Sequence, residues 1–387
     1  MIDQDSRIDT KKFVSFLQKS DIAFFGGVPD SLLKEFCACV NYWVDSSSHY
    51  VAANEGSAVA AGIGHHLGSG GVPLVYMQNS GLGNAVNPLV SLADTEVYSI
   101  PMILIIGWRG ELVEDGSQLK DEPQHIKQGR ITLDLLDVMD IPYRILSKTT
   151  DLALDQMNAL IRLAKKDSKP VAAVVRRNSF SSFATELVPQ FPDAPSREAV
   201  INKIISIIPP DTTIVATTGM TSRELFELRK ARGESHQHDF LTVGGMGHAS
   251  QIAAGIASSR PASRVICLDG DGALVMHMGG LLQTVRKHNL VHIVLNNGCH
   301  DSVGSQKTLV GNLSLSSFAG SCGFSYSARV STLDELGTTL EQFMSKLDRS
   351  CFLEALCSPG SRADLGRPSV SPSNNKIMFQ KSMKQSS

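Results

Sequence analysis

Short apolar, β-branched runs recur along the chain, and each one ends in a glycine-rich or polar loop. Near-continuous apolarity without strict alternation is typical of strands that are buried on both faces of a parallel sheet. Stretches with helical periodicity separate the runs, and this alternation predicts an α/β fold built from doubly wound parallel sheets. The runs are residues 22–25, 72–77, 102–106, 171–175, 213–216, 265–268, 291–295 and 352–357.

The length of 387 residues exceeds what one ordinary core holds and predicts two domains. Residues 179–195 read SFSSFATELVPQFPDAP, have no clear periodicity and are rich in proline towards their end. Such a segment is typical of a linker. We therefore expect domains at 1–178 and 197–367, a linker at 179–196, and a polar tail at 368–387 that is mobile or lies over the surface.

Composition excludes several classes of protein. A formal net charge of -2 argues against a nucleic-acid-binding surface and a polybasic membrane patch. No apolar run is long enough to span a bilayer, and the acidic amino terminus resembles no signal peptide. The 7 cysteines are scattered without a CxxC pair, so we expect reduced thiols and a cytoplasmic protein.

An acidic glycine turn follows the run at 265–268, where the sequence reads LDGDGA. Asp271 lies in this turn, and Asn297 lies at the end of the next apolar run. Because the carboxyl ends of neighbouring parallel strands meet at one edge of a sheet, we expect these two side chains to lie close together. Carboxylate, amide and carbonyl oxygens suit magnesium. A calcium loop is excluded because its twelfth position is Gly280, whereas a simple solvated turn stays open as an alternative.

The Gly-Asp-Gly turn followed by Asn296-Asn297 resembles the cofactor signature of thiamine diphosphate-dependent enzymes. The resemblance implies a pyrimidine-binding domain followed by a diphosphate-binding domain, without a middle domain. It also implies thiamine diphosphate and Mg2+ as cofactors. The implied metal ligands are Asp271, Asn297 and the backbone carbonyl of Cys299, and the implied diphosphate contacts in the turn are Gly270, Asp271, Gly272 and Ala273.

Two further segments of the second domain carry the resemblance. Residues 216–222, ATTGMTS, lie between a strand and a helix, where hydroxyls and amides suit phosphate; the alternative is an ordinary helix cap at Ser222. Residues 243–248, VGGMGH, resemble the loop that holds the aminopyrimidine through the Gly244 carbonyl and Met246, although methionine beside glycine is often only packing. The implied cofactor contacts of the first segment are Thr217, Thr218, Gly219 and Thr221.

The first domain contributes Glu55, which follows an apolar stretch and begins the Ala/Gly-rich segment 56–67. The resemblance implies that Glu55 is catalytic and hydrogen-bonds the pyrimidine ring of the cofactor. A carboxylate that only stabilises the helix dipole is the alternative. Residues 79–84, NSGLGN, resemble the glycine turn of this domain, with Leu82 where proline is common.

A loop-rich stretch of the first domain concentrates cationic side chains. Arginine can form paired hydrogen bonds with a doubly anionic headgroup, and lysine can add a positive point charge. A solvated loop whose acidic residues balance these positive charges is an open alternative. His125 or a water is the candidate proton donor to the former carbonyl carbon. The candidate substrate contacts are Asp30, Ser31, Arg109, Lys120, Lys127 and Arg130.

Across the whole chain the resemblance is closest to the phosphonopyruvate decarboxylases, on residues 27–34, 107–111, 121–130 and 362–368. It implies decarboxylation of a small 2-oxo acid, 3-phosphonopyruvate, to phosphonoacetaldehyde and CO2 in phosphonate biosynthesis. Sulfopyruvate decarboxylation, an acetolactate synthase-like carboligation and a non-catalytic cofactor-binding protein are the alternatives. Because the half-sites of this family meet across a subunit interface, we also expect self-association into at least a dimer.

Overall fold

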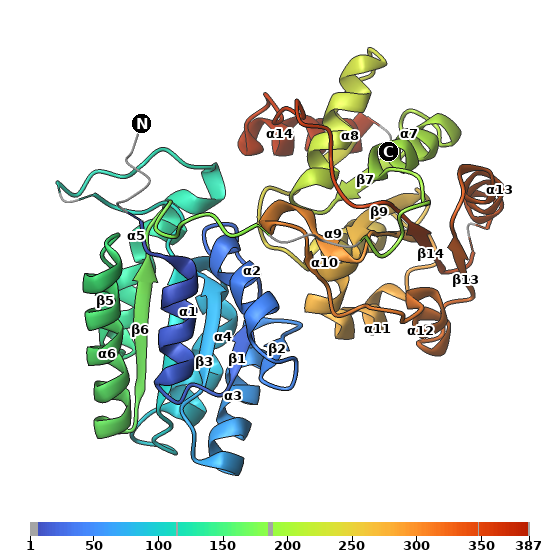
Figure 1. Cartoon of the computed structure of the whole chain (residues 1–387). Helices are drawn as coiled ribbons and strands as arrows, with labels where there is room; N and C mark the ends of the chain where they lie inside the picture. The colour runs from blue at the N-terminus through green and yellow to red at the C-terminus, as the bar shows by residue number, and fades with distance from the viewer. Residues whose placement is uncertain (1–6, 114, 185–188, 347, 386–387) are drawn as a thin grey trace. The chain divides into compact units, whose positions relative to one another are not determined.

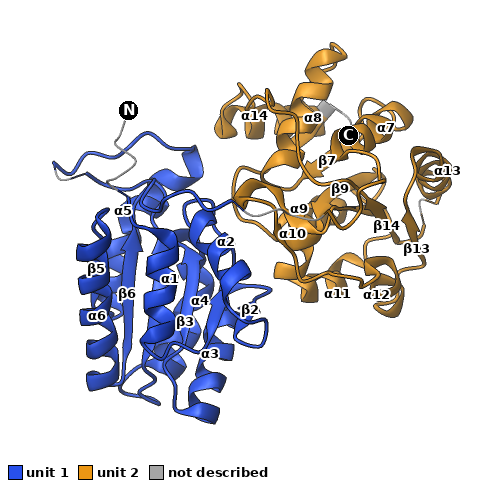
Figure 2. Cartoon of the chain, viewed as in Figure 1, with its two compact units in different colours: residues 1–187 blue, residues 188–387 orange. Residues whose placement is uncertain are grey.

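The chain divides into two compact units, residues 1–187 and 188–387 (Figure 2). The computed structural model describes residues 7–113, 115–184, 189–346 and 348–385. The division falls inside the segment that the sequence suggested as a linker. The start of that segment packs with the first unit, because the amide of Ile8 donates to the carbonyl of Ser179 at 2.8 Å and Phe180 is buried in the core.

The first unit is built on a parallel sheet with strand order β2-β1-β3-β4-β6-β5 (Figure 1). Its central strands are continuous apolar runs that are buried on both faces, as parallel strands between helical layers must be. The strands are β1 Phe25–Gly27, β2 His49–Val51, β3 Leu74–Gln78, β4 Met102–Gly107, β5 Tyr143–Ile145 and β6 Pro170–Val175.

Helices cover both faces of this sheet, so the unit is doubly wound. Apolar side chains of α1, α2 and α6 pack against one face and form the main core of the unit. Gly62 of α3 packs close to Met102 on the other face. The helices are α1 Thr10–Lys19, α2 Lys34–Trp43, α3 Glu55–Ser69, α4 Leu82–Pro88, α5 Pro123–Val138 and α6 Thr150–Asp167, with short helical turns η2 Asn79–Gly81 and η3 Leu89–Ala93.

The second unit repeats this architecture with strand order β13-β14-β10-β9-β7-β8, again wholly parallel. A small antiparallel pair, β11 with β12, extends from the loop after β10. The strands are β7 Thr213–Ala216, β8 Asp239–Leu241, β9 Val265–Gly270, β10 Leu290–Asn296, β11 Cys299–His300, β12 Gln306–Lys307, β13 Tyr326–Val330 and β14 Cys351–Leu356.

Helices α7, α8 and α13 pack against one face of the second sheet, and α9 to α12 pack against the other. The two predicted parallel-sheet units are therefore confirmed. The helices are α7 Arg197–Ile207, α8 Met220–Ala231, α9 Ala249–Ser259, α10 Asp271–Met276, α11 Leu281–Thr284, α12 Leu315–Ser321, α13 Leu333–Met344 and α14 Pro372–Gln385, with turns η4 Met278–Gly280 and η5 Asp301–Val303.

Two segments form helices that the sequence did not predict. Residues 123–138, whose first half was read as loop, form α5, which starts with Pro123 in the first turn, where proline is favoured because its missing N–H has no helical partner. Most of the polar tail forms α14, which buries Phe379. Asn375 of this helix also bonds the backbone of the edge strand β8, so α14 covers that edge. No described helix is long and apolar enough to cross a membrane.

Candidate active site

Predicted site residues of the second unit gather at the carboxyl edge of its sheet. Asp271 directly follows β9, and Asn297 directly follows β10, which is paired with β9 in parallel register. Both side chains are almost fully buried. The two strands therefore bring these residues to one edge, as their spacing predicted.

Asp271 is a buried carboxylate that accepts a hydrogen bond from a hydroxyl. The Oγ1 of Thr308 donates a hydrogen bond of 2.6 Å to Oδ2 of Asp271. Burial raises the pKa of Asp271 to about 7, against the lowering effect of this hydrogen bond. Because a buried carboxylate is costly unless a cation balances it, this environment fits a metal ligand.

The two neighbouring asparagines have different partners. Asn296 Nδ2 donates to Glu354 at 2.8 Å, and its Oδ1 accepts from the amide of Gly298 at 3.1 Å, so Asn296 shapes the turn. Asn297 Nδ2 donates to Asp301 at 2.8 Å, and its Oδ1 accepts from the amide of Cys299 at 3.2 Å. The first asparagine thus serves the fold, and the second lies with Asp271 and Cys299 in the group predicted to hold magnesium.

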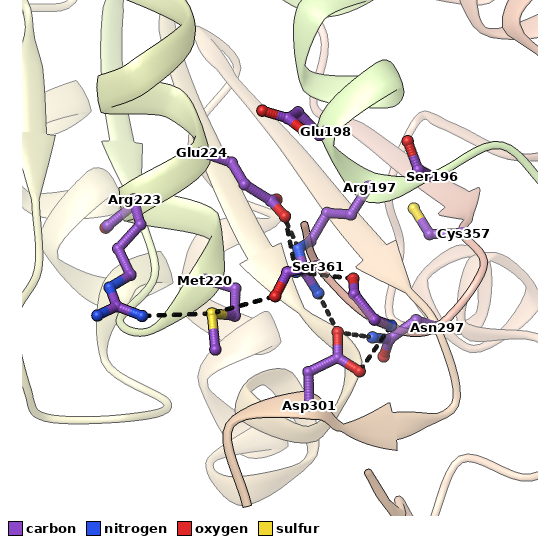
Figure 3. Close-up of polar contacts among 12 residues, drawn as sticks. Ser196, Arg197, Glu198, Met220, Arg223, Glu224, Asn297, Asp301, Cys357 and Ser361 are labelled. Atoms are coloured by element: carbon purple, nitrogen blue, oxygen red, sulfur yellow. Dashed lines mark hydrogen bonds and ion pairs between the residues drawn. The ribbon is translucent and has the colours of Figure 1, made fainter. Parts of the chain in front are cut away.

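Sequence reasoning did not include a charged network beside Asn297 (Figure 3). Arg197 forms a bidentate ion pair with Glu224, with N–O distances of 2.7 and 2.9 Å, and a further ion pair with Asp301. The Arg197, Glu224 and Asp301 side chains are no more than 6% exposed. Only the position of Asp301, four residues after Asn297, could have drawn attention to it in the sequence.

The phosphate-binding candidates form the loop between β7 and α8. Gly219 caps α8 with φ +91, a left-handed conformation that favours glycine, and no side chain bonds the helix from the capping position. Ser222 lies inside the helix and donates to the carbonyl of Thr217 at 2.8 Å, so the alternative cap at Ser222 is not formed. The amides of the first turn, together with Thr217, Thr218 and Thr221, suit an anion.

The predicted pyrimidine loop, residues 243–248, lies against the turn that follows β9. Gly245 and Gly247 both have positive φ, at +65 and +86. A Cβ on Gly247 would lie 3.1 Å from the carbonyl oxygen of Ala273. Gly244 and Met246 are partly exposed in this loop. A Cβ on Gly270 would meet nothing within 4 Å, so the turn leaves open space, whereas one on Gly272 would clash with His300.

Glu55 begins α3 in the first unit and is 5% exposed. Asn84 donates to it from Nδ2 at 2.7 Å. A Cβ on Gly81 would lie 2.4 Å from Oε1 of Glu55, so only glycine leaves room for the carboxylate there. The structure therefore brings the predicted glycine turn, residues 79–84, onto the predicted catalytic glutamate.

The candidate substrate residues of the first unit divide into two groups. Arg109 donates to both carboxylate oxygens of Asp121 and to Ser31 Oγ at 2.9 Å, and His125 Nδ1 lies 3.0 Å from Asp121. Asp30 lies beside this cluster, where burial raises its pKa to about 7 against the lowering effects of backbone amides and Arg109. Lys120, Lys127 and Arg130 are exposed to solvent.

Asp121 is one of the acidic residues of this loop, and it contacts both Arg109 and His125. Burial acts in the opposite direction, yet the bonds and charge of these partners hold the pKa of Asp121 well below its ordinary value. Burial, followed by the Arg109 charge, lowers the pKa of His125. Because an ionised carboxylate only accepts hydrogen bonds, Nδ1 of His125 donates to Asp121, and the lowered pKa favours the neutral ring.

Comparisons with known proteins find matches for both units of the chain. Residues 10–131 match the N-terminal TPP binding domain of thiamine pyrophosphate enzymes, and residues 217–355 match the C-terminal TPP binding domain. The sequence is 35% identical to a phosphonopyruvate decarboxylase of Streptomyces viridochromogenes, over 96% of this chain and 94% of the relative. It is also 35% identical to a phosphonopyruvate decarboxylase of Streptomyces hygroscopicus, over 85% of this chain and 82% of the relative.

A sulfopyruvate decarboxylase of Methanosarcina acetivorans is more distant, at 25% identity over 91% of this chain and 92% of the relative. The fold and the two matched domains define a two-domain thiamine pyrophosphate enzyme without a middle domain. Within that class, the chain belongs to the family of the phosphonopyruvate decarboxylases.

Proposed function

We propose that the protein decarboxylates 3-phosphonopyruvate to phosphonoacetaldehyde and CO2, with thiamine diphosphate and Mg2+ as cofactors. The observation that carries the proposal is the 35% identity to a phosphonopyruvate decarboxylase over 96% of this chain. The position of Asp271 and Asn297 at one sheet edge supports it independently. When bound, thiamine diphosphate supplies the carbon nucleophile and the electron sink for loss of CO2.

Residues of the second unit would hold the diphosphate and the metal. Asp271, Asn297 and the Cys299 carbonyl offer the oxygen donors that magnesium prefers, and the diphosphate would complete its coordination. The amides at the start of α8 and the open space beside Gly270 fit the diphosphate oxygens. In this proposal residues 197–367 are the diphosphate-binding domain and residues 1–178 the pyrimidine-binding domain.

Glu55 would hold a proton on the pyrimidine ring, with Asn84 fixing its carboxylate. The Gly244 carbonyl and Met246 of the second unit would also help to hold the pyrimidine. Glu55→Gln should retain cofactor binding and lose decarboxylation by at least about 100-fold, the range of general acid–base catalysis. The exposed Glu341→Gln on α13 is the matched control and should keep full activity.

The substrate end would be formed by Asp30, Ser31, Arg109 and His125. The Arg109 charge is shared with Asp121, so Arg109 would orient the anionic headgroup by hydrogen bonds more than by net charge. Lys120, Lys127 and Arg130 would add a cationic field at the surface. His125, whose ring Asp121 orients through Nδ1, or a water would give the proton to the former carbonyl carbon.

We further propose that the chain works as a dimer or a larger assembly of itself. Large apolar side chains are exposed just after the α4 turn that contacts Glu55, namely Val90, Leu92, Val97 and Tyr98. Such a patch favours association. The cysteines are unpaired, which supports the expectation of a reducing, cytoplasmic environment.

Subunit complementation tests whether the active site combines two copies. Co-expressed Glu55→Gln and Asp271→Ala chains should regain about one quarter of wild-type activity if each site takes one unit from each copy of a symmetric dimer. Each variant alone should stay inactive. If co-expression restores no activity, each site belongs to a single chain and the assembly proposal for the site is wrong.

Substrate preference is tested by turnover of phosphonopyruvate, sulfopyruvate and pyruvate on the purified protein with thiamine diphosphate and Mg2+. We expect the highest kcat/KM for phosphonopyruvate, measured as aldehyde and CO2 release. Faster turnover of sulfopyruvate would replace the proposed substrate, and acetolactate formed from pyruvate would indicate a carboligase. Magnesium is tested separately, because Asp271→Ala should weaken metal and cofactor binding together.

A further inference from the structure

We infer that Asp301 is a positioning residue that fixes the orientation of the Asn297 amide and so sets the affinity of the magnesium site. The inference rests on the proposed metal-binding role of Asn297. Asp301 lies at the start of η5, and its side chain is 6% exposed. It contacts the side-chain amide of Asn297 directly.

The amide of Asn297 can present either its oxygen or its nitrogen to a cation, and only the oxygen binds one. Its Nδ2 donates to Oδ2 of Asp301 at 2.8 Å. An ionised carboxylate only accepts hydrogen bonds, so the amide nitrogen must face Asp301 and the oxygen must face away. The amide of Cys299 also donates to Oδ1 of Asn297, at 3.2 Å, and favours the same orientation. Without Asp301 the orientation would rest on this longer bond, and rotation of the amide by half a turn would place N–H groups towards the metal.

Asp301 is itself held rigidly from several elements (Figure 3). Arg197, the first residue of α7, pairs with Oδ2 of Asp301, and Glu224 of α8 holds Arg197 from the other side. Oδ1 of Asp301 accepts from the amide of Gly360 at 3.0 Å and from the thiol of Cys299 at 3.2 Å. A carboxylate fixed by this many contacts can define the geometry of a neighbouring ligand.

The charge of the network also favours a cation. Glu224 and Asp301 carry two negative charges around the single positive charge of Arg197, and all three side chains are buried. Asp301, which contacts Asn297, carries one of the two negative charges. A divalent cation bound at Asn297 and Asp271 would offset this charge.

The test measures metal affinity without relying on turnover. Free Mn2+, a probe for the Mg2+ site, is followed by electron paramagnetic resonance with thiamine diphosphate in excess. Asp301→Asn should weaken Mn2+ binding by about tenfold, the lower range for loss of a partner behind a metal ligand. Asp301→Glu keeps the charge and the pairing with Arg197 but displaces the carboxylate, and it should also weaken binding.

A second background separates orientation from general charge or structure. In Asn297→Asp either oxygen can bind the metal, and the two acidic side chains repel each other. Adding Asp301→Asn there restores a donor–acceptor pair with reversed polarity, so the same change should leave affinity unaltered or strengthen it. A similar loss in both backgrounds, or an unchanged affinity in Asp301→Asn or Asp301→Glu, would overturn the inference.

Two control variants distinguish an effect of Asp301 on the metal site from a loss of stability and from a wrongly assigned metal site. Asp239→Asn breaks another buried aspartate–arginine pair of the same unit, with Arg229, and should lower stability without changing Mn2+ affinity. A loss of affinity as large in Asp239→Asn would show that Asp301 acts through stability alone. If Asp271→Ala binds Mn2+ as tightly as the wild type, the metal site itself is wrongly assigned, whatever Asp301 does.

Discussion

Asn84 donates a hydrogen bond of 2.7 Å from Nδ2 to Oε2 of Glu55. The bond joins the glycine turn after β3 to the first residue of α3, and the carboxylate lies against Gly81 in the same turn. Two motifs that are separate in the sequence therefore form one local structure. The position of the glutamate depends on the small size of the residues around it.

Gly81→Ala should displace Glu55, because the new Cβ would lie 2.4 Å from Oε1. The glutamate side chain can move, so folding should persist, but activity should fall by about 100-fold through misplacement of the carboxylate. The matched control is Gly83→Ala, two residues on in α4, whose Cβ meets nothing within 4 Å. Alanine stabilises a helix by about 1 kcal/mol relative to glycine. Gly83→Ala should therefore be as active as the wild type and no less stable. Equal activity of the two variants would contradict the proposed role of Glu55.

Asp121→Asn should loosen both Arg109 and His125, which the carboxylate contacts at once. We expect kcat/KM for phosphonopyruvate to fall by about 10- to 100-fold because both groups lose their fixed orientation. The Asp121 charge and hydrogen bond raise the pKa of His125, against burial, so their loss should lower it further. Proton NMR of the His125 ring measures this shift. Asp115→Asn, an exposed aspartate of the same loop, should change neither quantity.

Asp30 should make the first unit lose stability as the pH rises. Burial raises its pKa from the usual 3.8 to about 7, so between these values the folded state binds a proton that the unfolded state has lost. The free energy of unfolding should fall across this window by up to about 1.4 kcal/mol per pH unit. Asp30→Asn does not titrate, so its melting temperature relative to the wild type should rise from pH 4 to 7 and then level off. A constant difference would show that Asp30 ionises normally.

Asn375→Ala should weaken the edge of the second sheet. The Asn375 side chain accepts from the amide of Leu241 at 3.2 Å and donates to the carbonyl of Asp239 at 2.9 Å, as a neighbouring strand would. Two buried backbone groups would lose their partner, at a cost of about 1–3 kcal/mol. Urea unfolding followed by circular dichroism measures the change. Asn374→Ala, at an exposed neighbouring position, should leave the free energy of unfolding unchanged. Equal urea midpoints for the two variants would refute the proposed stabilisation of the sheet edge by Asn375.

The central strands were predictable because a strand between two helical layers must be apolar on both faces. Residues 102–106 and 171–175 were read correctly for this reason. The short strands β2 and β5 were missed, since each has 3 residues and an exposed side chain at its centre. Helix α5 was missed because its first turn begins with a proline and is largely polar, a pattern that also suits a loop.

The candidate site was predictable where residue type and position in the strand order act together. Asp271 and Asn297 follow neighbouring strands, so the parallel sheet alone brings them to one edge. Thr308 and Arg197 lie in segments without a recognisable motif. Their contacts with Asp271 and Asp301 depend on the path of the loops and on how α7 packs, which local sequence does not specify.

The sequence by itself determined the fold class, the two-unit organisation and the type of cofactor chemistry. Each of these follows from a periodic apolar pattern or from a short motif at the end of a strand. Only the tertiary structure decided which polar groups neutralise and orient one another, as with Asp121 between Arg109 and His125 or Asp301 between Arg197 and Asn297. The physical reason is that hydrogen bonds and ion pairs depend on distances of a few ångströms between residues that are remote in the chain. The burial of a strand, in contrast, can be predicted from the apolar side chains of the strand itself.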